Sequence, residues 1–470
     1  EVAESVLQNA AFERLTALRE VKADRIEDYF LTIEDQIVSM SENLMVVEAM
    51  AEFNSVFESV EGGGSRRSGI ARRRVLNYIE DEYLPRLPQE LRPDDAAALL
   101  PGSEAGVALQ DRYIASNEFA VGSKDELDTA AVDRYDELHL RYHPVIRSFL
   151  DRFGYYDIFL VEPENGTVVY SVYKEQDFAT SLSDGPYRSS GLADAFRAGR
   201  DAPAGDAARL IDFAPYLPSY GAPASFISSP IYRGDELLGV LVFQMPVERI
   251  NGIMTNDGNW QAEGLGESGQ TYLVGGDKRL RTESRLFLEE PTAFVQELQA
   301  TEGTEEAARD VTLFDTTILQ LTVDTVAVER ALAGDKGLTV IEDFRGVPLL
   351  SAYTPVNVLG SSWALLSEVE VAESEAAVDQ IQQPTVLVTA IVLILLIAVL
   401  LLVSRSITRP LKRTSTALSA IAEGEGDLTA SIEVRTRDEI ADLAGDFNRF
   451  VEKLHQIVSR IKQQVRQAEG

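Results

Sequence analysis

The sequence predicts an α+β region with antiparallel sheets, followed by one transmembrane helix and an all-α parallel coiled coil. Three observations lead to this division of the 470 residues. Segments that alternate apolar and polar residues lie between 155 and 370, an uncharged apolar run occupies 385–403, and heptad spacing of apolar residues follows that run. Alternation favours strands, a long apolar run favours a membrane helix, and heptads favour coiled coils.

The apolar run decides the topology. Its residues carry no charge and only two threonines, and Pro384 precedes it. As a helix it extends about 28 Å, close to the ~30 Å hydrocarbon core of a bilayer. Acidic residues dominate the N-terminal flank and basic residues follow, namely Arg405, Arg409, Lys412 and Arg413. The positive-inside rule predicts a span at 384–403 in a bacterial inner (cell) membrane, with 1–383 periplasmic or extracellular and 404–470 cytoplasmic.

The charge distribution agrees with that division. The chain has 43 Lys+Arg and 76 Asp+Glu, a net charge of −33. From Ser404 onward it has 11 basic and 10 acidic residues, so the excess acidity lies before the membrane helix. Such a field repels phosphate and excludes nucleic acid as a partner. There is no cysteine, which excludes disulfides and thiolate metal sites.

The first 57 residues predict one long N-terminal stalk helix. They contain no proline, and their apolar residues recur mostly at three- and four-residue steps. Such a helix would be about 80 Å long. Residue 1 is glutamate and no export signal precedes it. We therefore expect an upstream membrane helix in the natural protein, and interpret the sequence as a piece of a longer chain.

After the stalk, two mixed α+β modules are predicted, one membrane-distal at 58–250 and one membrane-proximal at 251–380. The distal module contains a hairpin, a helical segment and three more strands, at 155–162 and 167–173, 189–200, and 208–216, 224–232 and 236–246. The proximal module repeats this order on a smaller scale, with strands at 271–275, 338–344, 347–356 and 363–370.

Two such modules in series, between a long helix and a membrane helix, resemble the double Cache sensor domain, whose modules are PAS-like. The resemblance covers about residues 1–380 and includes DFATSLSDGPY (177–187), GESGQTYLVGGD (266–277) and RGVPLLSAYTPV (345–356). It implies a small-molecule ligand between the sheet of the distal module and the loop and helix that cover it. The matching residues of this chain are Asp157, Tyr170, Lys174, Asp177, Tyr187, Arg188, Asp212, Tyr216 and Tyr220.

The residue types at these positions indicate the kind of ligand. Aromatic walls with one arginine and one or two carboxylates suit a small polar or zwitterionic molecule. The subfamily that binds amino acids carries an Arg-x-Trp-Tyr run, whereas this chain has LPSYGAP at the corresponding loop, 217–223. The resemblance therefore does not extend to an amino-acid ligand.

Heptad spacing continues beyond the membrane helix. Apolar residues at steps of three and four predict two coiled-coil helices, one starting near Ile407 and one near Ile440, with a glycine-rich connector between them. Residues 404–458 resemble a HAMP domain, and 459–470 begin a signalling helix. Ala441 stands where that family usually has glycine. The residues that match the family's relay positions are Pro410, Leu418, Gly426, Leu428, Glu439 and Ile440.

Heptad helices cannot bury their apolar seams alone, so two of them per chain predict a parallel homodimer with a four-helix core. Two packings of such a bundle differ by only a few kcal/mol, which suits a switch.

Other motifs do not indicate catalysis. GLGESG at 264–269 has the spacing of a dinucleotide fingerprint, but a polar segment precedes it and a strand follows, the reverse of what that motif needs. His139 and His143 lie one helical turn apart without an identifiable third metal ligand. We therefore predict no catalytic residues, no metal, no cofactor and no enzymatic activity.

The helix segment FNRFVEKLHQIVSRI (447–461) looks most like those that lead into methyl-accepting chemotaxis proteins. The resemblances together imply a fragment of such a receptor, which senses a small extracellular molecule. Its partners would be a coupling protein and a kinase, which bind a cytoplasmic signalling module missing from this sequence. The alternatives are the front end of a sensor histidine kinase or a receptor nucleotide cyclase, and a membrane-tethered enzyme, adhesin or other binding protein. The HAMP-like segment disfavours a membrane-tethered enzyme or adhesin, because a protein that is only anchored to the membrane needs no helical bundle with two alternative packings.

Overall fold

The computed structural model describes residues 2–60, 65–203, 208–423, 428–429, 431–433 and 439–468. Within these ranges, the side chains of 2–9, 65–66, 375–386, 406, 410, 440 and 467–468 are left out of the description. The chain divides into two compact units, Glu1–Ala376 and Ala377–Gly470, and each is described by itself.

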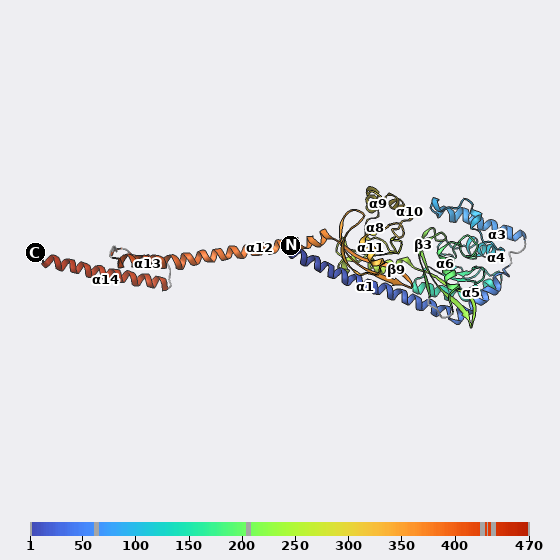
Figure 1. Cartoon of the computed structure of the whole chain (residues 1–470), viewed down its shortest axis with the longest axis horizontal. Helices are drawn as coiled ribbons and strands as arrows, with labels where there is room; N and C mark the ends of the chain where they lie inside the picture. Colours follow the sequence, from blue (N-terminus) through green and yellow to red (C-terminus); the bar gives the residue numbers. More distant parts are fainter. Residues whose placement is uncertain are drawn as a thin grey trace. The chain divides into compact units, whose positions relative to one another are not determined.

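The N-terminal region forms two helices where the sequence predicts one. Helix α1 spans Val2–Ser41 and α2 spans Leu44–Phe57. Asn43 separates them, because its extended backbone leaves the helical region and its side chain accepts a hydrogen bond from the backbone N–H of Met45. This is an N-cap, which starts a new helix. Helix α1 packs against strands of both sheets in this unit, so it is a structural spine rather than a free stalk (Figure 1).

The first sheet has five antiparallel strands in the order β2-β1-β5-β4-β3. Their bounds are β1 Asp157–Val161, β2 Val168–Ser171, β3 Arg209–Tyr216, β4 Ala222–Arg233 and β5 Glu236–Gln244. The predicted hairpin and the three later strands are confirmed. Helix α6 (Gly191–Arg200) packs on β3, β4 and β5, in agreement with the helical segment predicted there.

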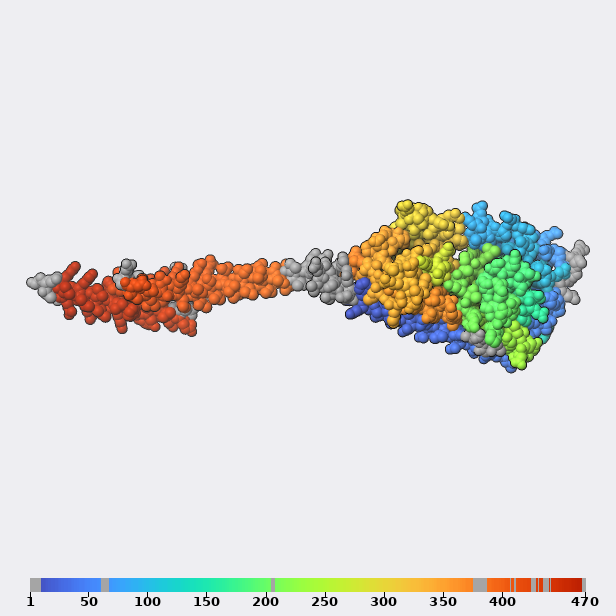
Figure 2. Space-filling view, viewed as in Figure 1, coloured from blue at the N-terminus to red at the C-terminus, as the bar shows by residue number. Residues whose placement is uncertain are grey.

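The second sheet has four antiparallel strands in the order β6-β9-β8-β7. They are β6 Gln270–Val274, β7 Gly337–Glu342, β8 Pro348–Val358 and β9 Ser361–Glu370. All four predicted strands of the smaller repeat are therefore confirmed. In Figure 2 the two sheet-containing lobes of this unit are seen beside each other, green for residues near 200 and orange for residues near 350.

Some of the remaining helices of the first unit pack on the sheets, and others pack on neighbouring helices. Helix α11 packs on β8 and β9, and α7 packs on β6. The bounds of these helices are α3 Ser65–Tyr78, α4 Glu104–Gln110, α5 Arg134–Phe153, α7 Val247–Thr255, α8 Arg285–Glu289, α9 Pro291–Ala300, α10 Glu305–Phe314 and α11 Val326–Leu332.

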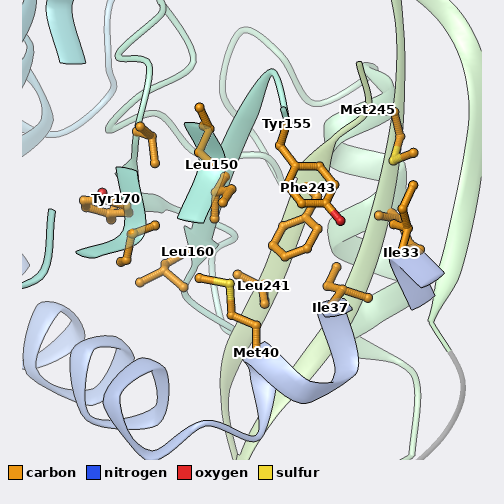
Figure 3. Packing of buried hydrophobic residues seen from close by; sticks show 14 of the residues in the cluster. Ile33, Ile37, Met40, Leu150, Tyr155, Leu160, Tyr170, Leu241, Phe243 and Met245 are labelled. Carbon is orange, nitrogen blue, oxygen red and sulfur yellow. The ribbon is translucent and has the colours of Figure 1, made fainter. Parts of the chain in front are cut away.

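The largest core lies where α1 and α5 pack on the first sheet (Figure 3). One stripe of α1 supplies Ile33, Ile37 and Met40, and these side chains face Leu241 and Phe243 of β5. Ile33, Ile37, Leu241 and Phe243 are at most 2% exposed. Full burial of such a side chain contributes about 1.5–3 kcal/mol. The three- and four-residue spacing on α1 thus fixes the helix to the sheet.

The second unit contains most of α12, together with α13 and α14. Helix α12 spans Val371–Val403, α13 spans Arg409–Ala422 and α14 spans Glu439–Ala468. Among the residues that the structure describes, no helix is both long enough and apolar enough to cross a membrane. The predicted span at 384–403 lies partly outside the described side chains and stays a prediction. The predicted domain boundaries likewise stay predictions.

Helices α13 and α14 pack on each other through Thr414, Ala444, Phe447 and Val451, all at most 6% exposed. Another set of heptad residues points away from this contact. Leu411, Leu418, Leu443, Phe450, Ile457 and Ile461 are 46–53% exposed. Of the predicted relay residues, Leu428 is half-buried and Glu439 is exposed. Gly426 lies outside the described residues, as do the side chains of Pro410 and Ile440.

Candidate ligand-binding site

A cavity of about 210 Å³ lies beside the first sheet, next to the start of β1 and the loop that follows β2. Tyrosines dominate its walls, and both signs of charge are present. The lining residues are Tyr78, Tyr83, Arg86, Val121, Gly122, Lys124, Tyr156, Tyr173, Lys174, Glu175, Gln176, Pro218 and Tyr220. A concave site with aromatic walls and a few polar groups is the usual form of a small-molecule site.

Two tyrosine pairs form much of the wall. The ring centroids of Tyr83 and Tyr220 are 5.4 Å apart, and those of Tyr156 and Tyr173 are 5.0 Å apart. Tyr220 has a positive φ of 59°, in the turn between β3 and β4. Non-glycine residues rarely adopt this conformation. The turn therefore directs the ring of Tyr220 to the cavity, although this backbone conformation is energetically unfavourable for a tyrosine.

Glu175 is the one carboxylate in the lining. Its Oε1 accepts a hydrogen bond of 3.0 Å from the hydroxyl of Tyr156, and its Oε2 accepts one of 2.6 Å from Ser219. Burial raises the pKa of Glu175, and the nearby charge of Asp177 raises it further. A cation that enters the cavity would favour the ionised carboxylate. Glu175 is therefore poised to respond to a positively charged ligand.

Next to Glu175 lies a buried cluster of three ionisable residues, Asp157, Lys174 and Asp177, of which Lys174 also lines the cavity. Each of the three is at most 2% exposed. Asp157 accepts hydrogen bonds at Oδ1 from the backbone N–H groups of Val172 and Tyr173, at 2.9 and 3.0 Å. Asp177 accepts one from the hydroxyl of Tyr216. Burial raises the pKa of both carboxyls, and repulsion from Asp177 also raises the pKa of Asp157.

Lys174 faces aromatic rings instead of a close carboxylate. Its Nζ lies 4.5 Å from the ring centre of Tyr170 and 5.0 Å from that of Phe178, distances typical of cation–π contacts. Burial lowers the pKa of Lys174, and attraction to Asp157 opposes that effect. Its φ is +62°, so a strained backbone position carries this side chain.

Two histidines of α5, His139 and His143, pack beside this cluster. Their rings stack with centroids 4.3 Å apart. Nδ1 of His143 lies 2.8 Å from the hydroxyl of Tyr170, and Nε2 lies 2.6 Å from the carbonyl oxygen of Asp125. Burial and the charge of Lys174 lower the pKa of both imidazoles. They are therefore neutral at physiological pH and connect the cluster to the core.

The structure brings together most of the residues predicted from the sequence. Tyr220 and Lys174 line the cavity, and Asp157, Tyr170, Asp177, Tyr187 and Tyr216 are buried in the surrounding core. Buried polar atoms without a protein partner include Oδ2 of Asp157, Oδ1 of Asp177, Oε1 of Gln176 and the hydroxyl of Tyr187. Such atoms in a native fold call for an explanation, and a ligand or water supplies one.

Two predicted residues lie elsewhere. The side chain of Arg188 is exposed, and Nη1 donates to the carbonyl oxygen of Gly185. Asp212 accepts hydrogen bonds from Arg281, which follows β6 of the second sheet. Arg188 thus does not line this cavity, because GPYR ends in a surface turn, and its role in ligand binding stays a prediction. Asp212 does not line this cavity either, because its side chain pairs with Arg281 of the other lobe, and its role in ligand binding likewise stays a prediction.

Several wall residues were not predicted, chiefly Tyr83, Lys124, Tyr156, Tyr173 and Glu175. Glu175 follows Lys174 directly, and Tyr156 and Tyr173 lie within the predicted hairpin strands, 155–162 and 167–173. Their positions beside predicted residues could have suggested them. Tyr83 and Lys124 come from segments far from the hairpin, and no local pattern identifies them.

Comparison with known families decides the identity of the C-terminal helices. Residues 402–456 match the HAMP domain family. This part of the chain is a HAMP domain. Its bounds agree within a few residues with the predicted 404–458. Its two helices are α13 and α14, and the connector joins them.

Curated relatives are methyl-accepting chemotaxis proteins. CtpM of Pseudomonas aeruginosa is 43% identical over 74 residues, which are 16% of this chain and 13% of CtpM. TlpQ of the same organism is 47% identical over 70 residues, 15% of this chain and 10% of TlpQ. McpA of Pseudomonas putida is 30% identical over 138 residues, 29% of this chain and 21% of McpA. The chain thus matches 10–21% of the length of these relatives.

Solved structures that resemble this chain are ligand-binding domains of chemoreceptors. One is Tlp3 of Campylobacter jejuni in complex with 4-methylisoleucine, 12% identical, with a TM-score of 0.38 over 78% of this chain and 94% of that one. Another is PctC of Pseudomonas aeruginosa in complex with GABA, 16% identical, with a TM-score of 0.29 over 51% of this chain and 82% of that one.

The architecture agrees with the double Cache resemblance stated from the sequence, and the HAMP domain follows it along the chain. Two antiparallel sheets follow one another along α1, and each carries helices on its outer face. The resemblance stated from the sequence is therefore confirmed for the fold. The chain is a relative of methyl-accepting chemotaxis proteins.

Proposed function

We propose that this chain is the sensor and relay part of a transmembrane chemoreceptor that binds a small zwitterion in the tyrosine-walled cavity. The observation that carries the proposal is the placement of Glu175 among four paired tyrosine rings, in a chain that also contains a HAMP domain. Because all the relatives named above are methyl-accepting chemotaxis proteins, chemotaxis is the output we favour over a histidine kinase or nucleotide cyclase.

The chemistry of the wall supports a zwitterion with a quaternary or tertiary ammonium group. Aromatic faces attract organic cations, and aromatic cages are a recurring way to recognise quaternary ammonium. Glu175 lies on the same wall, and a cation bound beside it favours its ionised form. Arg86 and Lys124 also line the cavity, so an anionic end finds cationic partners there. The ligand is therefore a compact molecule with both signs of charge.

Residues 385–403 form the membrane span in this proposal. From Leu387 to Val403, the large apolar side chains of α12 are 44–66% exposed. An apolar surface of this kind needs a cover, and lipid is the cover that its length suits. Residues 1–383 then lie outside the cytoplasm and 404–470 inside, in the inner membrane of a bacterium.

A second copy of the chain completes the relay. The exposed heptad residues of α13 and α14 described above would form the centre of a parallel four-helix bundle. Ligand binding changes the balance between two packings of this bundle only if the ligand prefers one of them. The signal then passes to a cytoplasmic module that a coupling protein and a kinase recognise.

The test uses three probes of nearly equal shape. Glycine betaine is the zwitterion, choline is its cationic analogue, and 3,3-dimethylbutanoate is its anionic analogue. We expect calorimetry of the purified chain to give one site per chain for glycine betaine, with weaker binding of choline and none of the anion. Glu175→Gln and Tyr220→Ala should each weaken binding about tenfold or more, whereas Arg188→Ala should leave it unchanged.

Equal binding of all three probes, or binding that Glu175→Gln and Tyr220→Ala leave intact, would contradict the proposed site. The output is tested separately, by fusing residues 1–470 to the signalling module of a methyl-accepting relative. Cells with this hybrid should change their swimming response when the bound probe is added. If the probe binds but the cells do not respond, the proposed binding site stands and the proposed chemotaxis output is contradicted.

A further inference from the structure

A second cavity, of about 260 Å³, lies in the second lobe between its sheet and the segments that cover it. Strands β6, β8 and β9 contribute Tyr272, Leu349 and Glu368, and the cover contributes residues such as Leu286 and Phe344. The lining is largely apolar, with Leu280, Leu286, Leu321, Val323, Ile341, Phe344 and Leu349. The family resemblance assigns the ligand to the other lobe, so this cavity has no assigned role.

The sheet register places this cavity at a position equivalent to the buried carboxylate of the first lobe. In the first sheet, Asp157 opens the five-residue strand β1 and pairs with Gln244 near the end of β5. In the second sheet, Gln270 opens the five-residue strand β6 and pairs with Glu368 near the end of β9. Each lobe therefore has one carboxylate opposite one amide at the same place, with the two residue types exchanged between strands.

Glu368 is held in a defined orientation at the floor of the second cavity. It is 1% exposed. Its Oε2 accepts a hydrogen bond of 2.7 Å from the hydroxyl of Tyr272, and its Oε1 accepts one of 2.8 Å from Ser351. Burial raises the pKa of Glu368 to about 7. A carboxylate has about four acceptor positions, so two hydroxyl donors leave capacity for a ligand.

The charges around the cavity select the sign of the ligand. None of the described lining residues is a lysine or an arginine. Two lining carboxylates already have cationic partners, since Asp343 accepts from Arg345 at 2.7 Å and Asp324 accepts from Lys278 at 2.5 Å. Among the salt bridges of the described residues, none joins Glu368 to a cation. Glu342 also lines the cavity, but it is exposed to solvent. Glu368 is therefore the buried lining carboxylate available to a positively charged group.

We propose that this second cavity binds a small primary amine with a branched hydrocarbon body, with the ammonium group at Glu368 and the hydrocarbon against the apolar lining. An ammonium has three donors, which suit the free acceptor positions of the carboxylate. The apolar lining contributes in proportion to the hydrocarbon area that it removes from water. This site stands independently of the tyrosine-walled cavity and of the zwitterion proposed there.

The experiment uses the whole purified chain and three probes that differ mainly in charge: 3-methylbutylamine, 3-methylbutan-1-ol and 3-methylbutanoate. Calorimetry is run at about pH 8, where Glu368 is largely ionised. We expect the amine to bind at one site per chain, the alcohol to bind more weakly and the carboxylate not to bind. Glu368→Gln, which keeps the size of the side chain, should weaken amine binding about tenfold or more.

A second variant tests the same cavity without changing the charge of Glu368, in case Glu368→Gln affects folding. Leu286 is half-buried in the cover and lines the cavity, so Leu286→Trp should fill the space and abolish binding of both amine and alcohol. Glu302→Gln, at an exposed position of the same lobe, is the matched control and should leave amine binding unchanged. The proposal is overturned if the folded wild-type chain binds no amine, or if the amine binds equally well to Glu368→Gln and Leu286→Trp.

Discussion

The carboxylate of Asp212 and the guanidinium of Arg281 form a two-pronged pair, with Nε to Oδ1 and Nη2 to Oδ2 both at 2.9 Å. Asp212 belongs to β3 of the first sheet, and Arg281 follows β6 of the second. The side chain of Arg281 is only 3% exposed, and that of Asp212 is 30% exposed. This pair therefore joins the two lobes of the sensor directly.

Removal of Asp212 should destabilise the chain. Asp212→Ala leaves the guanidinium of Arg281 buried, with Asp277 at 2.9 Å as its remaining carboxylate partner. We expect a loss of about 1–3 kcal/mol in the free energy of unfolding, measured by urea denaturation. Arg188→Ala, at an exposed side chain, is the control and should change stability by less than about 0.5 kcal/mol. Equal stability of both variants would mean that the lobes are held together without this pair.

The stability of the chain should depend on pH through Glu368. Burial raises the pKa of Glu368 to about 7 from an ordinary value of 4.5, so between these values the folded state binds more protons than the unfolded state. Stability from this group is therefore fully present below about pH 4.5 and falls as pH rises to about 7. Relative to Glu368→Gln, the wild-type chain should lose a few kcal/mol across this range, measured by urea denaturation at each pH. Parallel pH profiles of the two proteins would contradict this assignment.

The exposed seam of the HAMP helices should hold two chains together. Phe450 is 48% exposed at a heptad position of α14, and a charge there would be buried in the dimer. Phe450→Glu should therefore shift the chain from dimer to monomer in sedimentation velocity experiments in detergent. Glu452→Lys, at an exposed position on the same helix, should leave the dimer intact. A dimer that persists in Phe450→Glu would place the interface elsewhere.

Asn448 should hold the HAMP connector against α14. Its Oδ1 accepts a hydrogen bond of 2.8 Å from the N–H of Ile432, and its Nδ2 donates one of 2.9 Å to the carbonyl oxygen of Ile432. Asn448→Ala removes both, at a local cost of about 1–3 kcal/mol. Amide hydrogen exchange at residues 431–433 should then become faster by about tenfold or more. Arg449→Ala, whose side chain is 76% exposed, should leave that exchange unchanged.

Strand positions could be predicted from the sequence because alternation at period two is a local signal. The strand predicted at 236–246 is β5, Glu236–Gln244, and the strand predicted at 363–370 is β9, Ser361–Glu370. The break between α1 and α2 could not be predicted in this way. Asn43 is compatible with a helix by pattern, and only its capping hydrogen bond to Met45 shows where the new helix begins.

The site was only partly predictable, because its contacts join distant segments. Asp157, Lys174 and Asp177 lie close in sequence to the predicted hairpin, and the structure places them in one buried cluster. Asp212 has the residue type expected of a wall, but Arg281 lies 69 residues away and no local pattern predicts that pair. Glu175 accepts its hydrogen bonds from Tyr156 and Ser219, which come from two other segments of the chain.

The central claim is that occupancy of the tyrosine-walled cavity changes the packing of the HAMP helices. The chain has no cysteine, so Leu418→Cys places a single thiol at an exposed heptad position of α13. The measurement is the rate of disulfide cross-linking between two chains in membrane vesicles, with and without saturating glycine betaine. We predict that the zwitterion changes this rate several-fold and that Glu175→Gln abolishes the change. An identical rate with the cavity empty and full would contradict the account.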